Sequence, residues 1–278
     1  MYKALSPDCI GHSITIRESA AIAAKHGFEG LWFNLPRDSQ IELTETKELL
    51  EQYHLKAAGF NFPVEFNKDE GVYSEGMQNF EKYVRYASEA GMRRCVTWIL
   101  PASDMLDYKE NFEFHRRRLT EPAKILKEYN MTFGFEFLGP PKLRKGAKYE
   151  FIHTLDQMME LCNAIGTGNT GILMDVWHWD MAGQTLSDFK KLPDEAWVVL
   201  AHINDAPQGI PVEEQEDRVR CLPGATGVLK IAEFFRGLQQ LAYTGPVLAE
   251  PFVPELGKIS FEDAVITVKA AVDKVWPE

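Results

Sequence analysis

The chain has 278 residues, of which 45% are hydrophobic and 12% aromatic, so it can bury a large core and lacks the composition of a disordered segment. Lys and Arg number 30 and Asp and Glu 41, and the net charge of −11 argues against binding along a nucleic-acid backbone. The four cysteines form no CxxC pair, and neither a signal peptide nor an apolar membrane span is recognisable, so we expect a cytoplasmic protein with no membrane partner.

Short runs of apolar and β-branched residues recur eight times along the chain and alternate with segments of helical periodicity. Such runs are typical of strands buried on both faces, and we predict strands at residues 3–10, 29–34, 56–62, 93–100, 131–138, 170–177, 197–205 and 246–252. Between and after them we predict helices at residues 15–26, 43–53, 74–90, 108–129, 152–165, 186–191, 228–242 and 260–275. Gly27 and Gly91 suit the ends of two helices, and Ser260 suits the start of the last one.

Alternation of this kind predicts an α/β fold in which parallel strands are joined by right-handed crossovers. Eight strand–helix units are the number that closes a (β/α)8 TIM barrel. The alternative, a doubly wound open sheet, usually has a glycine-rich phosphate turn after its first strand, and DCIGHS is no such turn. No linker divides the chain, so we expect residues 1–278 to form a single TIM-barrel domain. The long irregular stretch 206–227 follows the seventh strand, where such loops are usually functional.

Four ionisable residues stand at the ends of consecutive predicted strands, from the fifth to the eighth. They are Glu136 in GFEFLG, Asp175 in ILMDVWH, His202 in VLAHIND and Glu250 in VLAEPF. Active-site groups of parallel barrels come from the C-terminal ends of the strands. Each separation is about one strand–helix unit, the last being lengthened by the irregular loop. Neighbouring strands would therefore bring all four side chains toward one point.

A charge inside an apolar strand is costly unless it is paired, hydrogen-bonded or bound to a metal. Taken singly, a glutamate at a strand end is usually a surface group, and a histidine is more often a core residue than a ligand. Together, three carboxylates would repel one another strongly, and a divalent cation removes that repulsion. Three oxygens and one imidazole suit Mn²⁺, Mg²⁺, Co²⁺ or Zn²⁺. We therefore predict one divalent metal ion, with Mn²⁺ expected, on Glu136, Asp175, His202 and Glu250.

Further polar and aromatic residues are expected around this point. His178, in DVWH, should stand at the barrel mouth, and Asp205, in HIND, either contacts the metal through water or holds a loop. Arg218 and Arg220 are the only basic residues of an acidic loop, where they either reach a substrate or neutralise neighbouring carboxylates. Several aromatic residues either stack on a sugar-like ring or belong to the core: Trp32, Phe33, Phe60, Phe62, Trp98, Trp177 and Trp179.

The segments FEFLGPP, LMDVWHWDMAG, HIND, DRVRCLPG and AEPF resemble the xylose-isomerase-like TIM-barrel superfamily of sugar isomerases and epimerases. Within it, the chain is similar to the inosose (2-keto-myo-inositol) isomerase family of inositol catabolism. The resemblance rests on specific motifs over residues 130–255 and is architectural before them. It implies metal ligands at Glu136, Asp175, His202 and Glu250. It also implies substrate contacts at His178 and Arg218.

Two metal-associated glutamates beside a substrate indicate proton transfer next to a carbonyl group. The metal would acidify the C–H bond, and an enediolate would form as one glutamate takes the proton and the other returns it. We assign Glu136 and Glu250 to this pair and leave their order open. His178 would steady the reacting hydroxyl, and Arg218 would hold an outer oxygen. The reaction expected is therefore isomerisation or epimerisation of a keto-polyol or keto-sugar.

The chain departs from the resembled pattern at the PGATG turn and at the basic residues of 140–149, where substrate selectivity would be decided. The substrate therefore stays open, and so do other functions. A dehydratase or lyase of the inosose or dehydroshikimate type, or one that cleaves a 3-keto C-glycoside, would use the same site. A three-zinc endonuclease IV barrel is disfavoured by the few histidines and the negative charge. A barrel that binds a metabolite without turnover is the non-enzymatic alternative, and a homodimer is an alternative to a monomer.

Overall fold

The computed structural model describes residues 1–278, and its centre is a ring of eight parallel strands. The strands are β1 (Tyr2–Leu5), β2 (Gly30–Phe33), β3 (Lys56–Asn61), β4 (Arg94–Ile99), β6 (Thr132–Phe137), β8 (Thr170–Asp175), β9 (Val198–Ile203) and β10 (Pro246–Ala249). β1 pairs with both β2 and β10, and this closes the barrel. The predicted TIM barrel is confirmed, and each of the eight predicted strands is present in shortened form.

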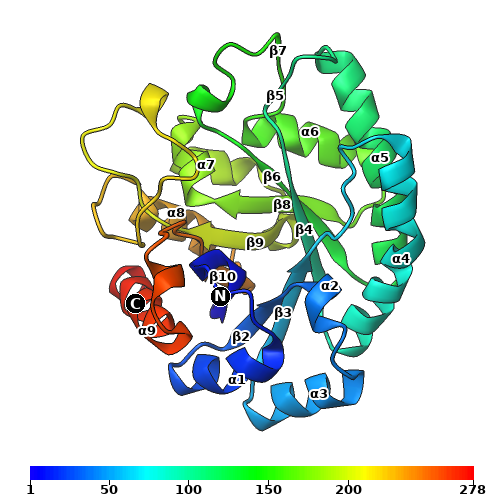
Figure 1. The fold of residues 1–278 in the computed structure, drawn as a ribbon. Coiled ribbons are helices and arrows are strands. Elements are labelled where there is room, and N and C mark those ends of the chain that lie inside the picture. Colours follow the sequence, from blue (N-terminus) through cyan, green and yellow to red (C-terminus); the bar gives the residue numbers. More distant parts are fainter.

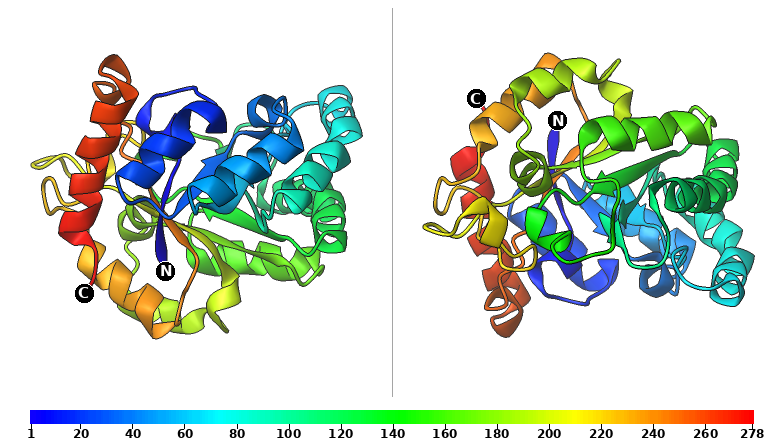
Figure 2. Two further views of the ribbon diagram at one scale, coloured as in Figure 1. Left: turned by 90° about the horizontal axis from the view of Figure 1, so that it is seen from below. Right: turned by 90° about the horizontal axis from the view of Figure 1, so that it is seen from above.

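Helices surround the strands and form the outer layer (Figure 1). They are α1 (Ile16–Lys25), α2 (Leu35–Asp38), α3 (Leu43–Gln52), α4 (Glu70–Glu89), α5 (Tyr108–Glu128), α6 (Leu155–Ile165), α7 (Val176–Met181), α8 (Ile231–Gln240) and α9 (Phe261–Val275). Seen from above and from below in Figure 2, they encircle the barrel, and the first and last helices lie side by side. No helix combines the length and the apolar character needed to cross a lipid bilayer.

Local chemistry explains where these helices begin and end. Gly27 follows α1 with a φ of 77°, the left-handed conformation that glycine adopts at low cost. The side chain of Ser260 accepts a hydrogen bond from the Asp263 amide and caps α9, as predicted. Helix α4 begins four residues earlier than predicted. The Asp69 carboxylate caps it by accepting hydrogen bonds from the amides of Gly71 and Val72, which lets the helix start through a glycine.

All eight strands end sooner than the sequence predicts, and the ends of β1 and β8 show why. β1 stops at Leu5, and Pro7 leads into a short 3-10 helix at Asp8–Ile10. β8 stops at Asp175, because its carboxylate accepts a hydrogen bond from the Trp177 amide at 2.7 Å and caps α7. The end of the strand therefore fixes the orientation of the Asp175 side chain.

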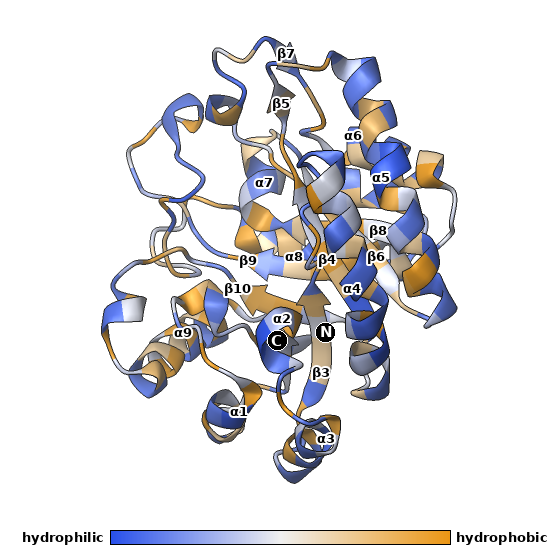
Figure 3. Ribbon diagram, turned by 45° about the vertical axis from the view of Figure 1, so that its right-hand side comes forward, coloured by the Kyte–Doolittle hydropathy of each residue, from blue (hydrophilic) through white to orange (hydrophobic).

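The apolar core has two parts. The larger part lies between strands and helices, and the outer helices α4 and α5 have hydrophilic as well as hydrophobic stretches in Figure 3, as expected of helices packed on a barrel. The smaller part fills the barrel interior: Tyr2, Ala4, Trp32, Ala58, Val96, Leu173, Val199, Leu200 and Leu248. Polar groups at the C-terminal ends of the strands therefore stand on an apolar floor.

Two loops extend beyond the C-terminal ends of the strands on one side of the barrel. The β4–α5 and β6–α6 loops pair as a small antiparallel sheet, β5 (Ala102–Ser103) with β7 (Tyr149–Glu150), at the top of Figure 1. A 3-10 helix at Pro141–Leu143 contacts another at Val212–Glu214 in the β9–α8 loop. Loops that follow β6 and β9, two strands separated only by β8 in the ring, thus contact each other.

Candidate metal and active site

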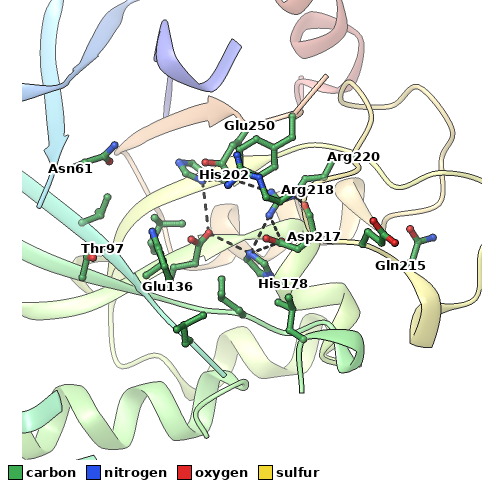
Figure 4. A pocket seen from close by; sticks show the side chains of 18 of the residues that line it. Asn61, Thr97, Glu136, His178, His202, Gln215, Asp217, Arg218, Arg220 and Glu250 are labelled. Atoms are coloured by element: carbon green, nitrogen blue, oxygen red, sulfur yellow. Dashed lines mark hydrogen bonds and ion pairs between the residues drawn. The ribbon is translucent and has the colours of Figure 1, made fainter. Parts of the chain in front are cut away.

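Four acidic and imidazole side chains converge at the C-terminal end of the barrel. Glu136 lies on β6, Asp175 ends β8, His202 lies on β9 and Glu250 directly follows β10. One ligand atom from each lies within 4.8 Å of every other, and Figure 4 shows three of the four side chains, Glu136, His202 and Glu250, close together. The first three residues are buried, at 6%, 0% and 6% exposure. The structure therefore brings together the four residues that the sequence predicts as ligands.

The three carboxylates of this cluster have unequal surroundings. Burial and the nearby carboxylates of Glu250 and Asp175 raise the pKa of Glu136 well above its ordinary value. Burial would also raise the pKa of Asp175, but the positive charge of Arg220, the His178 and His202 rings and the hydrogen bond from the Trp177 amide together outweigh it and lower that pKa to about 2. Glu136 therefore favours a proton or another positive charge, whereas Asp175 is ionised.

Two buried atoms of the cluster have no hydrogen-bond partner. Such atoms are evidence that the cluster can hold a cation. Glu136 Oε1 and His202 Nδ1 both lack a partner, although buried polar atoms nearly always have one. His202 Nδ1 lies 3.9 Å from Glu136 Oε1, 3.8 Å from Asp175 Oδ2 and 3.5 Å from Glu250 Oε2. A divalent cation would satisfy both atoms and offset the carboxylate repulsion, so the donor set fits Mn²⁺, Mg²⁺, Co²⁺ or Zn²⁺.

Arg220 is not among the site residues assigned from the sequence, and it takes the second of the two roles left open there, the neutralisation of carboxylates. Its side chain is buried, and Nη1 donates to Asp175 Oδ2 at 2.7 Å and to Glu250 Oε2 at 3.1 Å. Nη2 donates to Asp217 Oδ1 at 2.7 Å and lies 3.1 Å from His178 Nε2. Burial alone would lower the pKa of Arg220, but these carboxylates hold it above the usual range. Arg220 is thus a permanent positive charge beside the metal-binding cluster.

Arg218 lies in a different environment. It is exposed at the rim of the pocket, forms no hydrogen bond or ion pair, and its guanidinium lies 5.0 Å from the ring of Phe252. Sequence patterns could not separate the two arginines, because an irregular loop has no periodicity that shows which side chain turns inward. Arg218 therefore lies where it can contact a bound molecule, whereas Arg220 forms hydrogen bonds with the carboxylates.

His178 lies on α7, one turn beyond Asp175, and is buried at 1% exposure. Its Nε2 is 3.8 Å from Glu136 Oε1 and 3.5 Å from Asp217 Oδ1, as the dashed lines of Figure 4 show. Burial and the charge of Arg220 lower the pKa of His178 to about 4, so the ring is neutral near pH 7. A Cβ at Gly139 would overlap the His178 carbonyl oxygen, which explains the glycine at that position.

Asp205 anchors a loop, which is one of the two roles left open by the sequence. Its buried carboxylate accepts hydrogen bonds from four backbone amides, those of Ala206, Thr226, Gly227 and Leu229. The same residue forms an antiparallel bridge with Cys221. Asp205 thereby ties together the two ends of the loop that carries Asp217 and Arg220.

Charges of opposite sign join two loops over the mouth of the site. Lys142 Nζ donates to Glu216 Oε1 at 2.9 Å and to the carbonyl of Glu214 at 3.2 Å, and Lys145 Nζ donates to Glu214 Oε1 at 3.1 Å. The basic stretch 140–149 therefore pairs with the acidic loop. Exposed ion pairs add little stability, so their main consequence is to fix the position of the loops.

The cluster opens into a pocket of about 710 Å³. Its polar inner wall includes Glu136, His178, His202, Arg220 and Glu250, and its floor includes Val96 and Leu173. Two of the aromatic residues considered from the sequence line the pocket, namely Phe62 and Trp98. The other five are buried in the two parts of the apolar core.

The chain is similar in sequence to a known family and to a known enzyme. The family profile described as xylose isomerase-like TIM barrel matches residues 20–270. The inosose isomerase of Halalkalibacterium halodurans is 28% identical over 228 residues, which are 82% of this chain and 77% of that protein.

Two solved structures share the fold over 99% of this chain and 98% of their own chains. One is a xylose isomerase domain protein from Alicyclobacillus acidocaldarius, with a TM-score of 0.87 and 24% identity. The other is the IolI protein with a bound zinc atom, with a TM-score of 0.83 and 21% identity.

Proposed function

Because the chain belongs to the xylose isomerase-like TIM barrel family, we propose that it is a divalent-metal-dependent isomerase or epimerase of a keto-polyol or keto-sugar. The observation that carries the proposal is the convergence of four ligand atoms within 4.8 Å at the base of a pocket. The inosose isomerase of Halalkalibacterium halodurans, a related sequence, supports the choice of a keto-polyol.

Glu136, Asp175, His202 and Glu250 are assigned as the metal ligands, and Mn²⁺ is the ion expected, with Mg²⁺, Co²⁺ and Zn²⁺ as alternatives. The unpartnered atoms Glu136 Oε1 and His202 Nδ1 support this assignment. The zinc atom bound by the related IolI fold is consistent with an ion of this class. When bound, a divalent cation polarises a carbonyl and its neighbouring hydroxyl, and this acidifies the C–H bond between them.

Glu136 and Glu250 are assigned as the pair that transfers the proton. They enter the site from β6 and from the end of β10, and Figure 4 shows them on different sides of His202. One carboxylate takes the proton from carbon, and the other returns a proton to the adjacent carbon or to the opposite face. In the metal-free protein, burial and neighbouring carboxylates raise the pKa of Glu136.

His178 and Arg218 are assigned to the substrate. His178 is neutral near pH 7, because its pKa is lowered to about 4, and its Nε2 edge faces the carboxylates. A neutral imidazole there would steady the reacting hydroxyl. Arg218, which has no partner within the chain, would hold an outer oxygen of the substrate. Arg220 keeps Asp175 ionised and donates hydrogen bonds that hold Asp175 and Glu250 in place.

The proposal is tested by deuterium exchange. The Mn²⁺-loaded protein is incubated in D2O with a panel of keto-inositols and ketoses, and deuterium at the carbon next to the carbonyl is measured by NMR. We expect exchange and isomeric products with at least one of them. Glu250→Gln should lower the rate by about 10²–10⁴, because general acid–base catalysis contributes about that much. Glu233→Gln, a change at a partly exposed side chain on α8, is the matched control and should leave the rate unchanged.

Three outcomes would contradict the proposal. Full turnover by a metal-loaded Glu250→Gln protein would exclude the two-glutamate scheme. Loss of water from the substrate, seen as an unsaturated product, would replace the isomerase with a dehydratase that shares its first step. Binding of keto-sugars without exchange across the whole panel would indicate a barrel that binds a metabolite without turnover.

A further inference from the structure

The pocket above the carboxylate cluster has two chemically different halves. The inner half is polar and holds the residues assigned to the reaction. The outer half has five apolar side chains, Trp98, Leu100, Leu138, Leu143 and Phe252, which come from the ends of β4, β6 and β10 and from the loops after them, together with the charged side chains of Lys142, Glu216 and Arg218. A volume of about 710 Å³ is typical of sites for ligands larger than one sugar ring.

Large apolar side chains in the outer half are exposed to solvent. Trp98 and Leu100 are each 48% exposed, and Leu143 is 37% exposed. Single exposed apolar residues are common on proteins, but a group of them within one concave site usually marks a binding surface. Most other tryptophans of the chain are buried, including Trp32, at 4% exposure. The outer half therefore offers apolar area that no part of the chain covers.

Trp98 is placed directly beside the reaction centre. In the ladder between β4 and β6, Trp98 is the register partner of Glu136. Side chains of register partners on adjacent strands lie on the same face of the sheet. A molecule held at the carboxylates with a substituent pointing outward would therefore meet the indole first.

Phe252 limits the same space from the end of β10. It has a φ of 43°, an unfavourable left-handed conformation for a bulky residue, and it lies two residues after Glu250. Its ring lies 5.0 Å from the guanidinium of Arg218 and 4.6 Å from that of Arg220. The ring of Phe252 and the guanidinium of Arg218 thus lie near each other in the lining of the pocket.

We propose that the outer half is a subsite for an aromatic aglycone, so that the substrate is a keto-sugar glycoside instead of a free keto-sugar. This inference rests on the proposed function, because the inner half must hold the ketone and the neighbouring hydroxyl. A planar aryl group would cover Trp98 and interact favourably with the unpaired guanidinium of Arg218. A free polyol would leave the apolar side chains of the outer half exposed to water.

The first test compares two substrates whose substituent cannot leave after proton removal, the C-phenyl and C-methyl analogues of 3-keto-β-D-glucopyranose, in which the group is bonded to the anomeric carbon through carbon. Deuterium exchange gives kcat/KM for each with the Mn²⁺-loaded protein. We expect the aryl compound to be favoured by about tenfold or more, from burial of one aromatic ring. Trp98→Ala should reduce this ratio to near one. Met105→Ala removes a side chain that is 84% exposed but lies outside the pocket, and this control should keep the ratio.

The second test uses binding alone and does not depend on the reaction. Calorimetry compares 4-nitrophenyl and methyl β-D-glucopyranoside, which lack the ketone. An affinity ratio of about tenfold that Trp98→Ala abolishes would support the subsite even if no exchange occurs. Equal affinities, or equal kcat/KM values in a protein that catalyses exchange, would overturn the subsite and leave the proposed function standing. A dimer in light scattering that Trp98→Ala converts to a monomer would also overturn it, because a second chain would then cover the patch.

Discussion

Arg218 and Arg220 are two positions apart in the same loop but have opposite environments. Arg220 is buried against Asp175, Asp217 and Glu250, whereas Arg218 is exposed and unpaired. Removing one member of a buried ion cluster is costly, because the charges that remain are uncompensated. The same change at an exposed, unpaired residue removes little.

Substitution by methionine separates the two roles. Arg220→Met should lower the free energy of unfolding of the metal-free protein by about 3–5 kcal/mol and abolish turnover. Arg218→Met should change stability by less than about 0.5 kcal/mol and mainly raise KM. Urea unfolding in EDTA and steady-state kinetics measure both. Equal stability losses in the two variants would contradict this assignment.

At the residue scale, the sequence predicts the positions of site residues that lie on strands, but it does not predict the positions of those that lie in loops. Glu136, Asp175 and His202 lie on regular strands, so their spacing in the sequence indicates their common position in the barrel. Glu250 follows the last strand immediately and obeys the same rule. Arg220 lies in an irregular segment, where the side-chain direction depends on tertiary contacts such as the Asp205–Cys221 bridge. No pattern of apolar residues encodes such a contact.

At the scale of elements, the β9–α8 loop depends on one carboxylate. Asp205 Oδ1 accepts from Ala206 and Leu229, and Oδ2 accepts from Thr226 and Gly227. Burial would raise the pKa of Asp205, but these four amides hold it below its ordinary value. Its contribution to stability is therefore present above the pKa of the unfolded state and is lost as the pH falls through the lowered folded value.

Asp205→Asn tests this anchor, because the new amide group would face two backbone N–H donors in place of one oxygen. We expect a loss of about 1–3 kcal/mol in stability near pH 7 and a smaller difference from the wild type at strongly acidic pH. Hydrogen exchange should show faster exchange at Thr226, Gly227 and Leu229. Asp180→Asn, a change at a less buried carboxylate that also accepts from a backbone amide, is the comparison. Unchanged exchange in the loop would show that other contacts hold it.

Element ends were predicted less well than element types, for reasons visible at particular residues. The helix over 74–90 begins at Glu70 because Asp69 caps it, although glycine at position 71 weakens the helical pattern. The strand over 170–177 ends at Asp175 because that side chain caps the next helix. The β5–β7 sheet was not predicted, because two-residue strands have no periodicity. These additions build the pocket wall, so the sequence predicts the metal cluster better than the space above it.

For the whole molecule, barrel closure explains why the cluster has to be paired with a positive charge. Closing eight strands brings the ends of β6, β8, β9 and β10 together over an apolar floor, where carboxylates cannot be solvated by water. Arg220 compensates one side of the cluster, and the raised pKa of Glu136 shows that the other side is uncompensated. Metal binding and global stability are therefore coupled through this one carboxyl group.

The sign of this coupling is determined by the raised pKa of Glu136. In the metal-free protein the folded state holds this proton more tightly than the unfolded state, so stability falls as the pH rises through the shifted value. A divalent cation replaces the proton, and its binding strengthens over the same pH range. The increase in Tm caused by Mn²⁺ should therefore grow between about pH 5 and about pH 7.5. Calorimetry in two buffers of different ionisation enthalpy should show proton release on Mn²⁺ binding, which Glu136→Gln removes. A pH-independent Tm increase would exclude Glu136 as the proton-linked ligand.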